Sequence, residues 1–308
     1  MCKESDLLVS IVLPSYNHAE HIGRAIKSVI DQSHQNWELI IIDNFSTDNT
    51  DEVVARFDDS RIKFHKINNE GIISKSRNKG VFLSTGQWVA FLDSDDWWST
   101  DKLKKCLGSE SQYDLIYHKL EKYRLSKSGI IETVGTLHFR DVSENPYHDL
   151  LAFGPSLTTS AILVRKDLLR AVGQFDESPD IVGGEDYELW LRLAQIGARF
   201  KFKDISLGYY LVGGNHVTSA KRSLKIVDYI AEKYFEADLK KIPSWIHKSI
   251  IASYLKIGEY SKLIQYLRKI SRVLPPLSIA KIFLLFIIPS SKLCCTIFQR
   301  EYNSKRGD

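Results

Sequence analysis

The 308-residue sequence has few cysteines, a single methionine and no apolar stretch long enough to cross a bilayer. Its four cysteines are Cys2, Cys106, Cys294 and Cys295, and none has the C-x-x-C spacing of a zinc or redox site. This pattern argues against a disulfide framework and suits a reducing compartment. The N-terminus also lacks the apolar segment of a secretory signal. We therefore expect a cytoplasmic protein.

Apolar residues make up 44% of the chain, which is enough for a large globular core. The net charge of +4 conceals an asymmetry. Residues 221–308 contain 17 Lys and Arg against 7 Asp and Glu, a balance of +10, whereas residues 1–220 contain 25 against 31, a balance of −6. We expect a main domain at 1–220, with halves at 8–110 and 111–220, and a basic helical extension at 221–308. No nucleic-acid-binding motif accompanies the basic residues, so we expect no nucleic-acid partner.

Apolar runs typical of buried strands alternate with segments of helical periodicity over the first hundred residues. Strands are expected at 9–14, 39–42, 62–67 and 89–92, then at 113–117 and 159–164, with a loop-rich segment at 126–144. The alternation predicts an α/β fold with a mostly parallel, doubly wound sheet. Such sheets bind ligands where their strands end.

Three carboxylates, Asp93, Asp95 and Asp96, follow the strand at 89–92. In an extended chain Asp93 and Asp95 face the same side, where their oxygens suit a hard divalent cation such as Mn²⁺ or Mg²⁺. Water and a substrate diphosphate would complete the coordination shell. The structural alternative is that Asp95 or Asp96 caps a following helix.

Asp43 ends the strand at 39–42, so it should lie at the same edge of the sheet as the three carboxylates. It is placed to bind a base or ribose, although capping of the next helix explains it nearly as well. Arg77 and Lys79 are candidates for a phosphate clamp, and the alternative is that they belong to an exposed helical face.

Several motifs together resemble glycosyltransferase family 2 with its GT-A fold. In chain order they read VSIVLPSYN, LIIIDNFSTDNT, SKSRNKG, WVAFLDSDDWW, LRAVGQFDE and GEDYELWLR, within residues 8–218. The resemblance implies an inverting transferase of bacterial surface-polysaccharide type that uses a nucleotide-sugar and a divalent metal. Asn44 and Phe45 depart from it, because the family often has Asp-Gly there and the backbone freedom of glycine is lost.

The resemblance also implies roles for individual residues. The nucleobase would lie against Pro14, Tyr16, Asn17 and Asp43, with Arg77 near the phosphates, Asp93 on the ribose and Asp93 and Asp95 on the metal. The metal would stabilise the charge that develops on the departing nucleoside diphosphate. A loop containing His216 would close over the diphosphate, where His216 would contact the phosphates or complete the metal shell. A lone histidine in a polar turn is, however, more often without a ligand.

Asp186 is the expected catalytic base, and Glu185 would orient it or bind a donor hydroxyl. The two begin an amphipathic helix that ends near Gly197 and turns Leu189 and Trp190 toward the core. A carboxylate in the first turn of a helix is expected to stay ionised, as a base must. Simple helix capping would favour the same placement.

The sequence therefore predicts a metal-dependent glycosyltransferase with a UDP-sugar as the expected donor and a saccharide, expected to be lipid-linked, as the acceptor. The basic, apolar segment at 268–306 would contact the inner face of the plasma membrane peripherally, or would instead close the core. Two rivals stay open: a sugar-phosphate nucleotidyltransferase and a non-catalytic, membrane-associated scaffold that binds nucleotide-sugars. The first would be expected to carry a glycine-rich phosphate loop, which the residues after Pro14 do not form.

Overall fold

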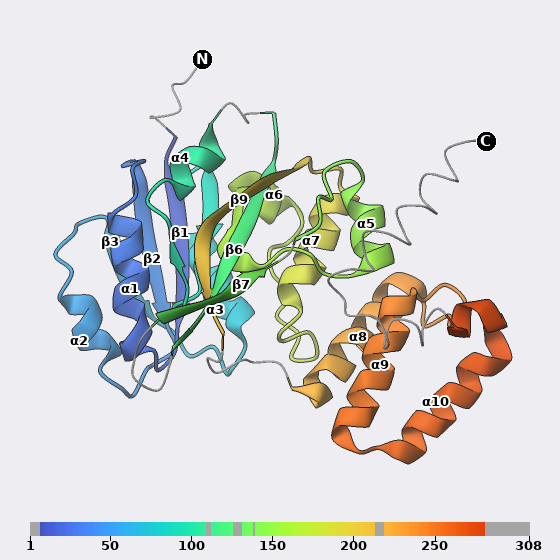
Figure 1. Ribbon diagram of the computed structural model, residues 1–308. Coiled ribbons are helices and arrows are strands. Elements are labelled where there is room, and N and C mark those ends of the chain that lie inside the picture. Colours follow the sequence, from blue (N-terminus) through green and yellow to red (C-terminus); the bar gives the residue numbers. More distant parts are fainter. Residues whose placement is uncertain (1–6, 109–111, 126–130, 138, 213–218, 281–308) are drawn as a thin grey trace. The chain divides into compact units, whose positions relative to one another are not determined.

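The computed structural model describes residues 7–108, 112–125, 131–137, 139–212 and 219–280 (Figure 1). The chain forms two compact units, one made of residues 1–147 and 156–216 and the other of residues 148–155 and 217–308. His216 and residues 281–308 lie outside the described residues, so the predictions made for them stay predictions.

The first unit is built on a nine-stranded sheet with the order β3-β2-β1-β4-β8-β6-β9-β5, and β7 pairs with β6. The strands are β1 (Val9–Ser15), β2 (Trp37–Asp43), β3 (Ile62–Lys66), β4 (Trp88–Phe91), β5 (Trp97–Trp98), β6 (Leu115–Leu125), β7 (Ile131–Leu137), β8 (Ile162–Arg165) and β9 (Phe200–Leu211). Strands β3, β2, β1 and β4 are parallel, and β8 is antiparallel to β4. The mixed α/β prediction is confirmed.

One expectation about the middle of the chain is wrong, and one strand was not expected. The segment at 126–144 contains β7, which pairs with β6 as an antiparallel hairpin. The long strand β9 was not anticipated, although its parallel pairing with β6 extends the sheet. The segment at 131–137 lacks clean alternation of apolar and polar residues, so periodicity gives little signal there. Residues 200–203 read Phe-Lys-Phe-Lys and do alternate, which is a strand signal that the sequence analysis did not use.

The helices of the first unit are α1 (Ala19–Ile30), α2 (Thr50–Ala55), α3 (Ile73–Leu83), α4 (Lys102–Leu107), α6 (Lys166–Ala171) and α7 (Glu185–Gln195), together with the 3₁₀ turn η2 (Thr159–Ala161). The apolar face of α1 joins a core that includes Ile11 and Leu39 of the neighbouring strands. Val12 belongs to the opposite face of β1, where a Cβ on Gly80 of α3 would come within 2.3 Å of its Cγ1. Glycine thus lets α3 approach the sheet closely.

We call the ends of β1, β2 and β4, with the loops that follow them, the carboxyl edge. The register pairs Ser15 of β1 with Asp43 of β2, and Val12 of β1 with Phe91 of β4. The loops after all three strands therefore leave the sheet at the same edge, where parallel α/β sheets bind ligands.

The second unit is helical. It contains α8 (Ala220–Phe235), α9 (Ser244–Ile257) and α10 (Tyr260–Val273), and residues 148–155 include most of α5 (Pro146–Phe153). The indole nitrogen of Trp245 donates to the carbonyl of Leu151 at 2.9 Å, which attaches α5 to α9. Among the described residues, no helix combines the length and hydrophobicity needed to span a membrane.

Candidate active site at the carboxyl edge

The acidic motif after β4 forms a tight turn, and the expectation of an extended chain at residues 93–95 is wrong. The amide of Asp96 donates to the carbonyl of Asp93 at 3.0 Å, which closes the turn. Ser160 of η2 accepts from the amide of Asp93 at 3.1 Å, and Asp96 accepts from the amide of Leu211 at 3.2 Å. The turn is therefore anchored to two segments that are distant in sequence.

The three carboxylates of this turn lie in one another's electrostatic field. Burial and the charge of Asp93 raise the pKa of Asp95. Burial and the charges of Asp95 and Asp93 raise the pKa of Asp96, whose Oδ2 has no hydrogen-bond partner within the described part of the chain. Crowded, poorly solvated carboxylates of this kind are stabilised by a nearby cation.

A divalent metal fits this turn, provided that a substrate completes its coordination. Asp93 and Asp95 offer oxygen ligands, which Mg²⁺ and Mn²⁺ prefer. In the described residues no cluster of three or more His, Cys, Asp and Glu side chains is arranged to hold a metal alone. Water and the oxygens of a diphosphate would have to fill the remaining positions.

Arg77 connects this turn to the start of α7. Its Nη2 donates to Asp93 Oδ1 at 2.8 Å and its Nη1 to Glu185 Oε1 at 2.6 Å. The residue is only 3% exposed, so the alternative of an exposed helical face is wrong for Arg77. Lys79, by contrast, lies 5.2 Å from the ring of Phe82, which is largely exposed. A contact between either side chain and phosphate stays a prediction.

Asp186 begins α7 beside Glu185, as the sequence analysis expects. Leu189 and Trp190 are fully buried and anchor this helix in the core. The expectation that Asp186 stays fully ionised is wrong, because burial and the charge of Glu185 raise its pKa to about 7. A carboxylate with a pKa near 7 is well suited to act as a general base at neutral pH.

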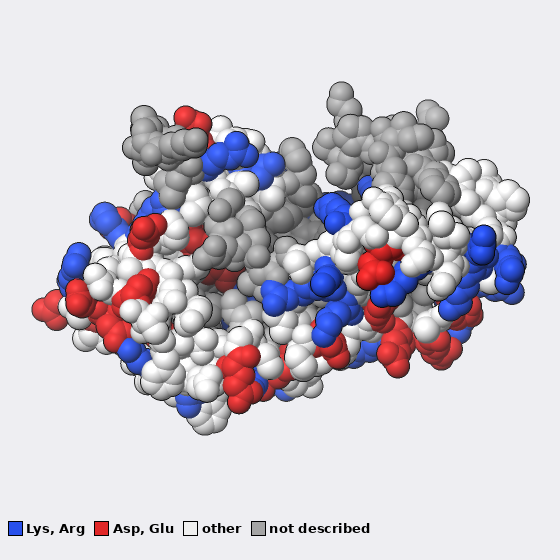
Figure 2. Space-filling model, turned by 90° about the horizontal axis from the view of Figure 1, so that it is seen from below, with Lys and Arg blue, Asp and Glu red and all other residues white. Residues whose placement is uncertain are grey.

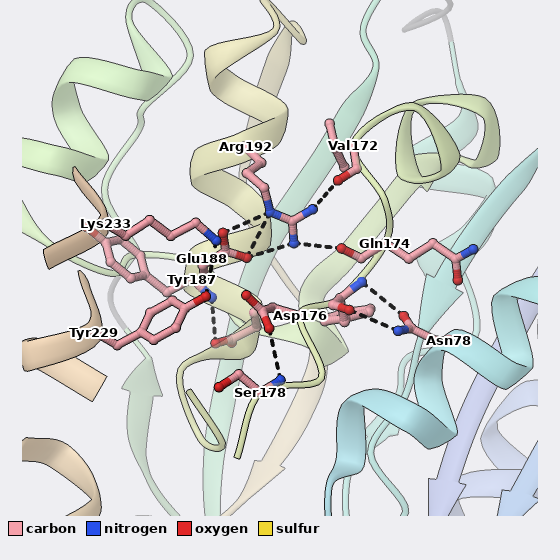
Figure 3. A network of polar contacts seen from close by, with 12 residues as sticks. Asn78, Val172, Gln174, Asp176, Ser178, Tyr187, Glu188, Arg192, Tyr229 and Lys233 are labelled. Atoms are coloured by element: carbon pink, nitrogen blue, oxygen red, sulfur yellow. Dashed lines mark hydrogen bonds and ion pairs between the residues drawn. The ribbon is translucent and has the colours of Figure 1, made fainter. Parts of the chain in front are cut away.

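The loop that leads into α7 is fixed by a polar network (Figure 3). Asn78 of α3 exchanges two hydrogen bonds of 2.9 Å with the backbone of Phe175. Arg192 of α7 donates to Glu188 at 2.8 Å and to the carbonyl of Gln174 at 2.6 Å. This network ties the segment LRAVGQFDE to both α3 and α7.

The residues expected at the nucleobase lie at the ends of β1 and β2. Pro14 belongs to β1, and Tyr16 follows it with 52% of its surface exposed. Asn17 accepts from the amide of Thr47 at 2.8 Å, which joins the two loops.

Asp43 is fully buried, and Ser46 donates to it from both its amide, at 2.7 Å, and its hydroxyl, at 2.5 Å. Asp43 therefore organises the turn after β2, and its contact with a base stays a prediction.

The structure also brings residues to the site that sequence reasoning missed. Thr159 Oγ1 donates to Asp93 Oδ2 at 3.1 Å. Arg24 of α1 donates to the carbonyl of Asp95 at 3.3 Å while its guanidinium lies 3.7 Å above the ring of Trp97. Tyr210 of β9 lies within the field of the carboxylates, and burial followed by their charges raises its pKa. No local pattern marks these residues, because their partners are distant in sequence.

Comparisons with known proteins agree with this geometry. The family described as Glycosyl transferase family 2 matches residues 10–127. The putative teichuronic acid biosynthesis glycosyltransferase TuaG of Bacillus subtilis is 29% identical over 218 residues, covering 70% of this chain and 82% of that protein. The UDP-Glc:alpha-D-GlcNAc-diphosphoundecaprenol beta-1,3-glucosyltransferase WfaP of Escherichia coli is 29% identical over 214 residues, covering 70% and 81%.

Solved structures show the same fold. Residues 1–349 of S. aureus TarS in complex with UDP align with a TM-score of 0.57 at 16% identity, over 86% of this chain and 90% of that one. The mannosyltransferase PcManGT from Pyrobaculum calidifontis, in complex with GDP-Man and Mn²⁺, aligns with a TM-score of 0.54 at 15% identity, over 90% and 78%.

The fold and the matched relatives define the class: this protein is a GT-A glycosyltransferase. The family match extends from β1 through the acidic turn to the end of β6. Residues 10–127 are the part of the chain that matches glycosyltransferase family 2, and two of the matched relatives are named for the biosynthesis of teichuronic acid and of amylovoran.

Proposed function

We propose that this enzyme transfers a sugar from a nucleoside-diphosphate donor to a hydroxyl of a lipid-linked saccharide, with inversion and with the help of a divalent metal. The observation that carries the proposal is the Arg77 bridge, which joins Asp93 of the acidic turn to Glu185, the neighbour of Asp186. The bridge links the acidic turn, which would hold the leaving group, to the start of α7, which would supply the base.

In this reaction Asp186 accepts the proton of the acceptor hydroxyl as that oxygen attacks the anomeric carbon. Glu185 is held by Arg77 and by the amide of Gly183 at 2.5 Å, so it fixes the start of α7 and thereby the position of Asp186. Asp93 and Asp95 would hold the metal. When bound, the metal stabilises the charge that develops on the leaving diphosphate.

The proposed substrates follow from the relatives. WfaP is named as a transferase from UDP-Glc to a diphosphoundecaprenol-linked sugar, and TarS has been solved with UDP and with UDP-GlcNAc. We therefore assign a UDP-sugar as donor and a saccharide carried on a lipid diphosphate as acceptor. A GDP-sugar is the rival donor, since PcManGT has been solved with GDP-Man.

A lipid-linked acceptor places the reaction at a membrane surface, and we assign peripheral contact to the segment at 268–306. Its described part includes Arg268, Lys269 and Arg272 of α10. Tyr260 and Ile264 of the same helix are 61% and 49% exposed. Basic and apolar side chains together favour binding to anionic membranes. Figure 2 shows Lys and Arg side chains on the surface of the helical unit, with acidic residues between them.

The test of the reaction is a transfer assay with the full chain, Mn²⁺, UDP-sugars and GDP-sugars, and a set of undecaprenyl-diphosphate-linked saccharides. We expect one donor to give a lengthened lipid-linked product, with inverted anomeric configuration by NMR, and chelation by EDTA to stop its formation. Transfer that is undiminished in EDTA would contradict the metal dependence. A product with retained anomeric configuration would contradict the single-base, inverting mechanism.

Membrane contact is tested separately by flotation with vesicles. We expect the full chain to float with phosphatidylglycerol vesicles but not with phosphatidylcholine vesicles. Replacement of Arg268, Lys269 and Arg272 by Gln should weaken that binding, because each basic residue contributes on the order of 1 kcal/mol at an anionic surface. Equal flotation with both kinds of vesicle would contradict an electrostatic contact.

A further inference from the structure

The acidic turn is held by the short 3₁₀ turn η2, which directly precedes β8. Thr159 Oγ1 donates to Asp93 Oδ2 at 3.1 Å, and Ser160 Oγ accepts from the amide of Asp93 at the same distance. Burial and neighbouring charges raise the pKa of Asp96, and a hydrogen bond with Ser160 opposes that rise. Two consecutive residues of η2 therefore contact the acidic turn.

The hydrogen bonds at Thr159 have a fixed direction. Its Oγ1 lies 3.4 Å from Nη2 of Arg77, and a guanidinium can only donate. The hydroxyl proton is therefore available to Asp93, whose ionised carboxylate can only accept. Because Arg77 also donates to Oδ1 of Asp93, this carboxylate is held at both of its oxygens. The two contacts fix the plane of the carboxylate and leave the other lone pairs of its oxygens for a metal ion.

A buried lysine contacts the segment that contains η2. Lys102 of α4 is fully buried, and its Nζ donates at 3.2 Å to the carbonyl of Ile162, the first residue after η2. The same nitrogen lies 3.9 Å from the ring centroid of Trp98, whose indole donates to the carbonyl of Ser160 at 2.8 Å. Lys102 and Trp98 thus hold two backbone carbonyls next to Thr159.

The burial of Lys102 is unfavourable for folding. In the described part of the chain no acidic side chain pairs with it, and burial lowers its pKa to about 8. Removing an ammonium group from water costs free energy that one carbonyl and one aromatic ring offset only in part. An apolar residue of similar length would fill the same space without this cost. The contacts of Lys102 with η2 are therefore better explained by function than by stability.

We propose that η2 positions the metal site: Thr159 fixes the carboxylate of Asp93, and Lys102 together with Trp98 fixes η2. Thr159 and Lys102 are positioning residues, because they act through Asp93 and not on the substrate. The inference rests on the proposed function, since it assumes that Asp93 binds the divalent metal. Loss of a group that orients a metal ligand typically weakens metal affinity roughly 10- to 100-fold.

The test is titration of Mn²⁺ into the full-length protein in the presence of UDP, followed by water proton relaxation, with a protein-free titration as the reference. Thr159→Val removes the hydroxyl and keeps the shape of the side chain, and we expect its Kd for Mn²⁺ to rise roughly tenfold or more. Thr159→Ser keeps the hydroxyl and should bind Mn²⁺ like the wild type. If Thr159 instead competed with the metal for Asp93, Thr159→Val would bind Mn²⁺ more tightly, which would overturn its role.

The variant Lys102→Met separates positioning from folding. Methionine fills a similar volume without a charge, so we expect the variant to melt in metal-free buffer at the wild-type temperature or a few degrees higher. We expect its Kd for Mn²⁺ to rise at the same time. A lysine that only stabilised the fold would give the opposite result, a lower melting temperature and an unchanged Kd. Lys104→Met, an exposed change on the same helix, is the matched control and should alter neither quantity.

The outcomes distinguish this inference from the proposed function. If the wild type binds Mn²⁺ with UDP and Thr159→Val binds it equally tightly, positioning by Thr159 is overturned and the transferase proposal stands. Equal weakening in Thr159→Ser and Thr159→Val would also overturn the role of the hydroxyl. If Lys102→Met does not fold, or melts lower with an unchanged Kd, the role of Lys102 is overturned, and the two Thr159 variants decide the rest. If the wild type binds Mn²⁺ with neither UDP nor GDP, the inference and the metal-dependent transferase proposal both fail.

Discussion

Buried carboxylates at opposite ends of the parallel sheet have opposite environments. At the start of β2, Glu38 accepts from the hydroxyl of Ser10 at 2.7 Å, from the amide of Thr85 at 2.6 Å and from Lys63 at 2.6 Å. Burial opposes its ionisation, but the hydrogen bonds from Lys63, Ser10 and Thr85 outweigh burial and lower its pKa to about 2. At the other end, burial and mutual repulsion raise the pKa values of Asp95 and Asp96.

This difference in pKa distinguishes a carboxylate that stabilises the fold, Glu38, from carboxylates that a bound cation would stabilise, Asp95 and Asp96. The charge of Glu38 is fully compensated by donors within the chain, so ionisation of this group favours the folded state. Donors within the chain compensate the charges of Asp95 and Asp96 less completely, so ionisation of these two groups opposes folding unless a cation is bound. A buried carboxylate with a raised pKa in a ligand-binding edge is thus a stronger sign of function than burial alone.

The largest effect is expected for the base. Asp186→Asn removes the group that accepts the proton of the acceptor, and we expect kcat to fall by about 10² to 10⁴ with nucleotide affinity unchanged. Steady-state kinetics combined with UDP titration measures both. Asp31→Asn, an exposed change directly after α1, is the matched control and should leave kcat as in the wild type. A rate within twofold of the wild type for Asp186→Asn would exclude Asp186 as the base.

The second prediction concerns pH. Burial and the charge of Glu185 raise the pKa of Asp186 to about 7, and only the ionised form accepts a proton. We therefore expect kcat/KM to fall about tenfold per pH unit below 7 and to level off above it. Glu185→Gln removes the neighbouring charge and should move the midpoint to lower pH. A flat profile between pH 5.5 and 8 would show that no group of this pKa limits the reaction.

At the opposite end of the sheet, Glu38→Gln should lower stability by about 2 kcal/mol, because the hydrogen bonds from Ser10, Lys63 and Thr85 lose their charged, buried acceptor. Activity per folded molecule should stay unchanged. Since the folded pKa is about 2 and lies below the unfolded value, the contribution of Glu38 is complete above about pH 4.3 and is lost as the pH falls toward 2. Urea unfolding of both proteins across this window measures the difference. Glu70→Gln, on an exposed pair with Lys75, should leave the curve unchanged.

The smallest effect is expected for the stability of Asp95→Asn. Because burial and Asp93 disfavour the charged form of Asp95, the neutral residue should keep the melting temperature in metal-free buffer equal to that of the wild type or raise it by a few degrees. Thermal unfolding monitored by circular dichroism measures this change. A clear loss of stability would mean that Asp95 is compensated within the chain as Glu38 is.

Much of the carboxyl edge could be predicted from the sequence, because it depends on local patterns. The apolar runs before Asp43 and Asp93 identify strands that end at one edge, and the helical period after Asp186 identifies α7. The partners of these residues could not be predicted in the same way. Arg77 and Glu185 are 108 positions apart, and no periodicity connects them.

The protonation of Asp186 and the conformation of the acidic motif could not be predicted from the sequence either. The placement of Asp186 in the first turn of a helix suggests an ionised carboxylate, but the neighbouring charge and burial depend on how α7 packs and reverse that expectation. In the same way, the alternation rule placed Asp93 and Asp95 on one side of an extended chain, whereas the hydrogen bond from Asp96 to Asp93 folds the motif into a turn. Tertiary contacts decided both cases.

Whether donor and metal bind together at the acidic turn is tested most directly by titration of UDP, with and without Mn²⁺, into the wild type, Asp95→Asn and Asp186→Asn. We expect metal-dependent binding of equal affinity by the wild type and Asp186→Asn, and loss of the metal-dependent part in Asp95→Asn. Equal metal-dependent binding by all three proteins would contradict the assignment of the acidic turn as the place where donor and metal meet.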